Sequence, residues 1–140
     1  MRTIAAVLLL ATVVLPDSAQ ACVPWRPKIY FQPGTIRPLD AQVSTLEGIA
    51  STMERMPTAN LVLISHTEVQ LDERRSKELA QSRASIMAEE LTRRGVSPRR
   101  ISTRPEGSAG DRDTLDVAMS NYVWFVLTDS TGTPLTCSGT

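Results

Sequence analysis

The chain has 140 residues, and its 15 lysines and arginines balance its 15 aspartates and glutamates. A chain without net charge has nothing to draw it toward nucleic acid or a bulk anionic membrane, so neither is expected as a partner. The length suits one domain with a single core. Five arginines gather between Arg93 and Arg104, and we expect them to be solvated at a helix end and in the loop after it.

The first 21 residues have the pattern of a secretory signal peptide. Arg2 precedes an apolar run from Ile4 to Leu15, and Ala19-Gln20-Ala21 forms an A-x-A cleavage site. The run is shorter than the roughly 20 residues that a transmembrane helix needs, and no other stretch comes close. We therefore expect an exported protein whose mature chain, residues 22–140, is one domain without a transmembrane segment.

Cys22 and Cys137 are the only cysteines, and they lie at opposite ends of the mature chain. In an exported protein this favours a disulfide that joins the two termini. Closing so long a loop contributes about 4 to 5 kcal/mol in the chain-entropy account. The alternative is a lipid on Cys22, as in bacterial lipoproteins, although Ala19 stands where such a signal favours Leu and Cys137 would then lack a partner.

Two patterns open the mature domain. Bulky residues from Lys28 to Phe31 predict a short strand that Pro33-Gly34 ends. Apolar residues then recur at the spacing of an amphipathic helix that ends before Pro57. They are Val43, Leu46, Ile49, Ala50, Met53 and Met56.

The middle of the chain predicts a buried strand and a second helix. Leu61 to Ile64 is a continuous apolar run, typical of a central strand buried on both faces. Asp72 is a good N-cap for a helix that Gly95 terminates. We expect this helix to turn four apolar side chains inward: Leu79, Ile86, Met87 and Leu91.

The last part of the chain predicts two more strands. Arg100 to Thr103 is a plausible short strand, and Tyr122 to Leu127 is the last one. Between them, the segment 105–116 is rich in Gly, Asp and Ser and predicts a loop. The tail from Thr128 is turn-like and is expected to need Cys137 to hold it in place.

The order strand, helix, strand, helix, strand, strand predicts an α+β fold, an α/β two-layer sandwich. A mixed four-stranded sheet would carry two main helices on one face. The core would lie within residues 28–128, and a short tail would follow it. No internal repeat or low-complexity tract interrupts this order.

Two motifs carry a resemblance to a known family. Ser65-His66-Thr67-Glu68 and Ser76-Lys77-Glu78-Leu79-Ala80-Gln81-Ser82-Arg83-Ala84 are similar to the G-H-T-D and N-x-x-L-S-x-x-R-A signature of the OmpA-like peptidoglycan-binding domain. The resemblance continues on both sides, from Ile29 to Pro38, from Leu91 to Ser102 and from Ala118 to Leu127. It implies the OmpA-like fold, divergent in detail, for the whole mature domain.

The resemblance also implies a binding site. In the family, the Asp of H-T-D and the Arg of R-A hold the diaminopimelate side chain of the peptidoglycan stem peptide, the Asp taking its ammonium and the Arg its carboxylate. Glu68 and Arg83 occupy those positions, and Thr67, Ser76 and Asn121 are expected beside them. The implied partner is peptidoglycan, and the implied location is the periplasm or the outer membrane. No cofactor is expected.

The sequence departs from the family signature at several positions. Glu68 is longer than the Asp of the motif by one carbon–carbon bond, about 1.5 Å. Ser65 replaces Gly, Ser76 replaces Asn and Ala80 replaces Ser. At the start of the last strand, Ser120-Asn121-Tyr122-Val123 stands for N-R-R-V, so two arginines that frame the site in the family are absent.

Metal binding and catalysis have little support in the sequence. His66 is the only histidine and has no second His or Cys at ligand spacing, so we expect a hydrogen-bonded residue at a strand end. Thr67 is expected to cap the turn that follows. No serine lies in a G-x-S-x-G elbow, and no Gly-rich phosphate loop is present. Trp25 and Trp124 are expected to pack in the core or at the sheet edge.

Two functions remain open at this point. The first is non-covalent binding of peptidoglycan through Glu68 and Arg83. The second is a module of the same fold that binds other envelope proteins or has a structural role and has lost affinity for the wall. Neither requires enzymatic activity, and only the first requires both charged side chains.

Overall fold

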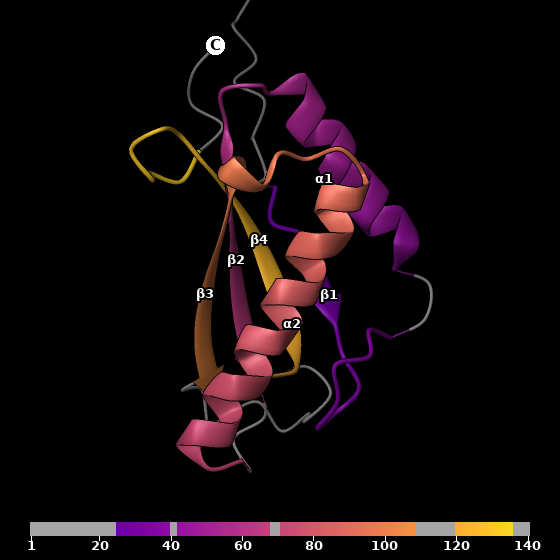
Figure 1. The fold of residues 1–140 in the computed structure, drawn as a ribbon, viewed down its shortest axis with the longest axis vertical. Helices are drawn as coiled ribbons and strands as arrows, with labels where there is room; N and C mark the ends of the chain where they lie inside the picture. The colour runs from indigo at the N-terminus through magenta and orange to yellow at the C-terminus, as the bar shows by residue number, and fades with distance from the viewer. Residues whose placement is uncertain (1–24, 40–41, 68–70, 109–119, 136–140) are drawn as a thin grey trace, which may run out of the picture.

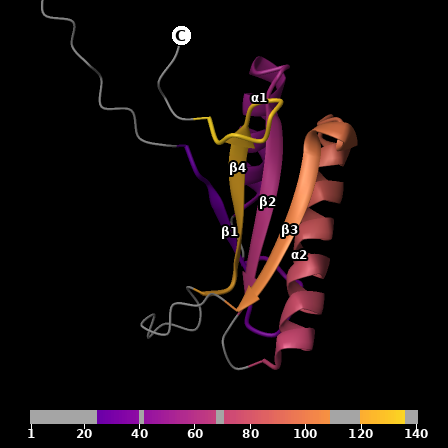
Figure 2. The same ribbon diagram turned by 90° about the vertical axis from the view of Figure 1, so that its left-hand side faces the viewer.

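The computed structural model describes residues 25–39, 42–67, 71–108 and 120–135. These residues form a sheet of four strands in the order β1-β4-β2-β3, in which β2 and β3 are parallel and the other pairs are antiparallel. Two α-helices cover one face of this mixed sheet (Figures 1 and 2). The elements in chain order are β1 (Lys28–Tyr30), α1 (Val43–Arg55), β2 (Asn60–Thr67), α2 (Glu73–Arg93), a 3-10 turn η1 (Pro98–Arg100), β3 (Ile101–Ser108) and β4 (Tyr122–Thr128). The predicted fold class is confirmed.

The core lies between the sheet and the two helices. Leu61 and Leu63 of β2 and Phe125 of β4 are fully buried, because the inner strands receive neighbours from both sides and from the helices. β2 and β3 run parallel, so the chain must cross between them, and α2 makes this crossover against the sheet. No helix in the described ranges is both long enough and apolar enough to span a membrane.

Helix α1 has the predicted bounds but a narrower buried face than its apolar pattern indicates. Leu46, Ile49 and Met53 are buried. Val43, at 59% exposure, and Met56, at 36%, are not. These two residues lie at the ends of the helix, where the core no longer covers them.

The C-terminal end of α1 is held by an arginine of the 3-10 turn η1. Arg100 donates from Nη1 to the carbonyl of Met53 at 3.0 Å, from Nη2 to that of Met56 at 2.5 Å and from Nε to that of Ala59 at 2.8 Å. The last carbonyls of a helix lack partners within the helix, and this guanidinium supplies them. Arg100 therefore differs from the solvated arginine that the sequence predicts.

Helix α2 begins and ends where its capping residues predict. The Asp72 carboxylate accepts from the backbone N–H of Arg75 at 3.0 Å, and Gly95 follows the helix with a φ of 93°. The inward side differs from the prediction, because Leu79 and Ile86 are only half-buried. The residues of α2 that are fully or almost fully buried are Ser76, Ala80, Arg83, Ala84, Met87 and Leu91.

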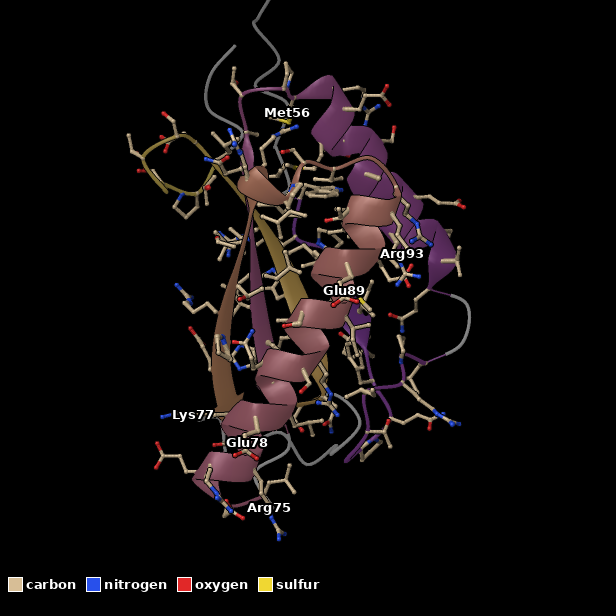
Figure 3. The ribbon with its side chains drawn as sticks, in the orientation of Figure 1. Met56, Arg75, Lys77, Glu78, Glu89 and Arg93 are labelled. Atoms are coloured by element: carbon tan, nitrogen blue, oxygen red, sulfur yellow. The ribbon has the colours of Figure 1, made fainter. Side chains whose placement is uncertain are left out.

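Small residues at the centre of this buried side allow α2 to approach the sheet closely. Ala80 and Ala84 have no exposed surface. Figure 3 shows Glu78, Glu89 and Arg93 along the opposite, solvent-facing side of the helix, where they are exposed. The helix thus presents one charged side to water and one side of small residues, with Arg83 among them, to the sheet.

Strand β3 is longer than predicted. It extends to Ser108, so residues 105–108, predicted as loop, belong to the sheet. β3 is an edge strand, where Pro105 is tolerated because only one side of the strand needs to donate to a neighbour. The strand is irregular next to this proline: its register against β2 shifts between Ser65 and His66, and Gly107 has a φ of 73°. The rest of the predicted loop, 109–119, lies outside the described residues.

The segment after β4 is held by its own turn. The Asp129 carboxylate accepts from the backbone N–H groups of Thr131 at 2.8 Å and Thr133 at 3.0 Å. The N–H of Leu135 then donates to the carbonyl of Leu127 at 2.9 Å. These bonds hold the described part of the tail, and the role of Cys137 stays a prediction. Both Cys137 and Cys22 lie outside the described residues, as does the predicted signal peptide.

Candidate functional site

The predicted site residues gather at one end of the sheet, the lower end in Figure 1. Thr67 is the last residue of β2, Ser76 lies in the first turn of α2, and Asn121 directly precedes β4. Arg83 projects toward them from the buried side of α2. Glu68 follows Thr67 in the chain but lies outside the described residues.

Arg83 is the central residue of this end. Its side chain has no exposed surface, and its guanidinium lies 5.0 Å from the centre of the Phe31 ring. Nη1 donates to the Asn121 side-chain oxygen at 2.9 Å and to the His66 carbonyl at 3.2 Å. Among the described residues, Asn121 and His66 thus accept from the guanidinium on its inner side.

The outer side of the same guanidinium contacts the loop after β1. Nε donates to the carbonyl of Thr35 at 2.8 Å, and Nη2 donates to that of Gln32 at 3.2 Å. We call Arg83, with the four acceptors that the described residues provide on Gln32, Thr35, His66 and Asn121, the Arg83 clasp. The clasp joins the loop after β1, the end of β2 and the start of β4, and hydrogen bonds to a charged donor are among the stronger ones in a protein.

Two buried hydroxyls lie next to the clasp. Thr67 and Ser76 are hydrogen-bonded to each other through their side chains, and both are at most 1% exposed. The Thr67 hydroxyl thus contacts α2, where the sequence predicts a turn cap. A Cβ at Gly107 would lie 3.1 Å from the Ser76 oxygen, so β3 approaches α2 closely here.

A cavity of about 330 Å³ opens beside these hydroxyls. Its charged lining residues are Glu73, Lys77 and Glu106, and Lys77 pairs with Glu73 at 2.8 Å. Figure 3 shows Lys77 at the start of α2, on the β3 side of the helix. A small cavity that carries both signs of charge suits a ligand that also carries both.

His66 is built into the sheet differently from the prediction. Its Nε2 lies 3.5 Å from the Glu106 carboxylate, and its ring lies 4.8 Å from that of Tyr122. Its Nδ1 is buried and has no hydrogen-bond partner among the described residues, whereas we expected a hydrogen-bonded strand-end histidine. Burial lowers the pKa of His66, and this effect outweighs the opposing effect of Glu106. The described residues contain no group of three His, Cys, Asp or Glu that could hold a metal ion.

The lowered pKa of His66 predicts a loss of stability in mild acid. The folded protein favours the neutral ring, so the unfolded chain takes up the proton first, and stability falls as the pH drops below the ordinary value of 6.5. His66→Asn is expected to remove this component, because His66 is the only histidine. Urea unfolding between about pH 7 and pH 5 checks it, since this is the range in which histidine titrates. If the free energy of unfolding of the variant fell with pH as steeply as that of wild type, His66 would not be the group responsible.

The comparison with known families decides what this arrangement belongs to. The sequence profile described as the OmpA family matches residues 30–120. The chain belongs to the OmpA family. The match includes Thr67, Ser76 and Arg83 and confirms the resemblance drawn from the two motifs.

Solved structures of this OmpA-family fold are similar to the chain. The peptidoglycan-associated lipoprotein from Burkholderia pseudomallei is 18% identical, with a TM-score of 0.66, over 72% of this chain and 89% of that one. The C-terminal domain of Helicobacter pylori MotB is 22% identical, with a TM-score of 0.64, over 76% and 88%. The OmpA-like domain of FopA1 from Francisella tularensis is 12% identical, with a TM-score of 0.59, over 74% and 72%. At these identities the likeness shows the fold. A comparison with curated sequences found no match.

The OmpA-family signature explains some contacts and misses others. Asn121 stands where the family signature has an arginine, and its neutral side chain accepts from Arg83. Ser65, at the position of the motif glycine, is fully buried, and its hydroxyl has no hydrogen-bond partner in the part of the chain that the structure describes. The carbonyls of Gln32 and Thr35 could not be predicted, because any residue offers a carbonyl. The burial of Arg83 could be inferred from the sequence, because its spacing from Ala80 and Met87 puts the three residues on the same side of a helix.

Proposed function

We propose that this OmpA-family domain binds peptidoglycan non-covalently at the cell envelope, with the diaminopimelate of a stem peptide held between Glu68 and Arg83. One observation carries the proposal: the guanidinium of Arg83 donates to the carbonyl of His66, two residues before Glu68 in the chain. Membership of the OmpA family and the likeness to a lipoprotein described as peptidoglycan-associated support it.

The contacts of Arg83 suggest how the ligand would enter. The carbonyls of Gln32 and Thr35 cover the outer side of the guanidinium, and Gln32 is exposed to solvent. A ligand carboxylate would replace these carbonyls, since a hydrogen bond between two charged groups is stronger than one to a neutral carbonyl. The loop after β1 therefore moves away from the guanidinium when the ligand binds, while His66 and Asn121 keep the arginine in place.

The ammonium group of the ligand would lie on the other side, against carboxylates. Glu68 is the carboxylate that the family pattern assigns, and Glu73 and Glu106 line the cavity of about 330 Å³ next to Ser76. Thr67 and Ser76 then form the floor between the two charged ends. We propose no enzymatic activity, since the arrangement supplies complementary charges and hydroxyls that are already bonded to each other.

Sedimentation with insoluble peptidoglycan tests the proposal. The full chain is expressed in a host with a periplasm and recovered from it, with an N-terminus at Cys22 and no free thiol expected. Wild type should sediment, Glu68→Gln should lose about tenfold in affinity, or about 1.4 kcal/mol, and Glu78→Gln, an exposed glutamate of α2, should bind as wild type does.

Two further arms sharpen the result. Arg83→Lys keeps the charge but loses the planar fork, so it should also bind weakly while remaining folded by circular dichroism. Peptidoglycan with lysine in place of diaminopimelate lacks the side-chain carboxylate that Arg83 is proposed to bind. It should therefore sediment less of the protein. Folded wild-type protein that stays in the supernatant would refute wall binding and direct the search to a protein partner. A cytoplasmic, uncleaved chain would refute export.

A further inference from the structure

The face of the sheet opposite the helices carries a group of aromatic side chains. Ile29, Val123 and Phe125 point into the core, so the alternating neighbours Tyr30, Tyr122 and Trp124 point to the other face. We call these three residues the aromatic platform. Tyr30 and Tyr122 are cross-strand partners with ring centres 6.0 Å apart, and all three side chains are half-exposed.

The chemistry of the platform differs from that of the core. Both phenylalanines of the chain, Phe31 and Phe125, are fully buried, whereas the platform rings each carry a polar group. Lys28 places its ammonium 4.5 Å from the centre of the Tyr122 ring and 5.7 Å from that of Trp124, and Arg26 lies 5.2 Å from Trp124. Lys28 and Arg26 are exposed, so both can move aside.

Two polar atoms on this face have no hydrogen-bond partner among the described residues. They are Nε1 of Trp124 and Nδ1 of His66, and both are buried. His66 is 9% exposed, and its ring lies against Tyr122 at the edge of the platform. Buried polar groups in proteins are nearly always bonded, so each of these two atoms has hydrogen-bonding capacity that the described residues leave unused.

The platform is continuous with the Arg83 clasp. Tyr122 follows Asn121, which accepts from Arg83. His66 packs its ring on Tyr122 while its carbonyl accepts from the same guanidinium. A polymer with a peptide branch could therefore occupy both places at the same end of the sheet.

We propose that the aromatic platform binds the glycan strand, a chain of N-acetylated amino sugars, of the polymer whose stem peptide occupies the Arg83 site. The inference rests on the proposed function. The apolar face of a sugar ring packs on Tyr and Trp rings, and a few placed polar groups fix its orientation. Lys28 moves off the rings and donates to sugar hydroxyls.

An acetamido group has the donor and the acceptor that would complement the two unbonded atoms. Its carbonyl accepts from the N–H of Trp124. Its N–H donates to Nδ1 of His66, which is an acceptor when the ring carries its proton on Nε2, the nitrogen that faces Glu106. An N-acetylated sugar thus offers one acceptor and one donor where the protein lacks one of each.

Fluorescence of Trp124 tests the proposal. Trp25→Phe removes the other tryptophan, which is 39% exposed, so the signal then comes from the platform. The probes are soluble oligomers of N-acetylglucosamine and glycan strands freed of stem peptides. We expect both to change the emission and to protect Trp124 from a soluble quencher. Tyr122→Leu should lower the affinity for the oligomer about tenfold. The urea midpoint of unfolding should stay unchanged.

The outcomes separate the two sites. Glu68→Gln should bind the stripped strands as wild type does and should bind intact peptidoglycan about tenfold more weakly. Wild type that binds intact peptidoglycan but neither oligomers nor stripped strands overturns the platform and leaves the proposed function standing. Binding of stripped strands alone supports the platform and refutes the peptide site. Equal binding of single-stranded DNA would also overturn the assignment, since aromatic and cationic surfaces bind nucleic acid as well.

Discussion

Replacing Arg83 by alanine is expected to lower the free energy of unfolding by about 3 to 4 kcal/mol, because each buried acceptor left without its donor costs about 1 to 3 kcal/mol. The carbonyls of Thr35 and His66 and the side chain of Asn121 would all lose the same donor group. Urea unfolding followed by circular dichroism measures this loss.

Arg93 provides the matched control for this experiment. It is an arginine of the same helix, its side chain is 66% exposed, and it pairs only with Glu90 among the described residues. Arg93→Ala should change the free energy of unfolding by no more than about 0.5 kcal/mol. An Arg83→Ala loss as small as that of the control would show that the clasp does not stabilise the fold.

The structural role of Arg83 changes how its ligand role must be tested. A truncated Arg83 would fail to bind peptidoglycan whether or not it contacts the ligand, because the site itself would be disturbed. Arg83 would also persist in a domain that no longer binds the wall, since the fold needs it. Glu68 is therefore the more informative position.

Arg100→Ala is expected to lower the free energy of unfolding by about 2 kcal/mol, since it removes hydrogen bonds from a charged donor, each worth about 1.5 to 3 kcal/mol, at a partly solvated site. The carbonyls of Met53 and Met56 at the end of α1 lose their partner, as does that of Ala59. Urea unfolding measures the loss, and amide exchange should accelerate at the last turn of α1.

Arg99 lies beside Arg100 in η1 and is exposed, so Arg99→Ala controls for charge and composition. It should remain within about 0.5 kcal/mol of wild type. Equal effects of the two substitutions would show that the local positive charge, and not the bonds to α1, accounts for the change.

Local signals in the sequence predicted the elements of the fold well. Asp72 caps α2, Gly95 follows its end, and Leu61 to Ile64 form the inner strand, because caps, glycines and apolar runs act over a few residues. The length of β3 was not predictable in this way. Gly and Pro there indicate a loop, and only pairing with β2 keeps residues 105–108 in the sheet.

The site was predictable in part for the same reason. The motifs identified Arg83, Thr67 and Ser76, and the structure brings these residues together at one end of the sheet. The carbonyl partners of Arg83 come from segments far away in the chain, and backbone groups leave no trace in a sequence. The ligand roles of Glu68, Arg83, Thr67, Ser76 and Asn121 stay predictions.

The clasp also bears on how long the folded protein lasts. Arg83 bonds residues 48 and 51 positions before it and 38 positions after it. We expect contacts of such separation to form late in folding, with the packing of α2 on the strands, because closing long loops early is entropically unfavourable. Interactions that form after the rate-limiting step of folding act mainly on the rate of unfolding. We therefore expect Arg83 to slow unfolding more than it speeds folding, and so to lengthen the lifetime of the native state.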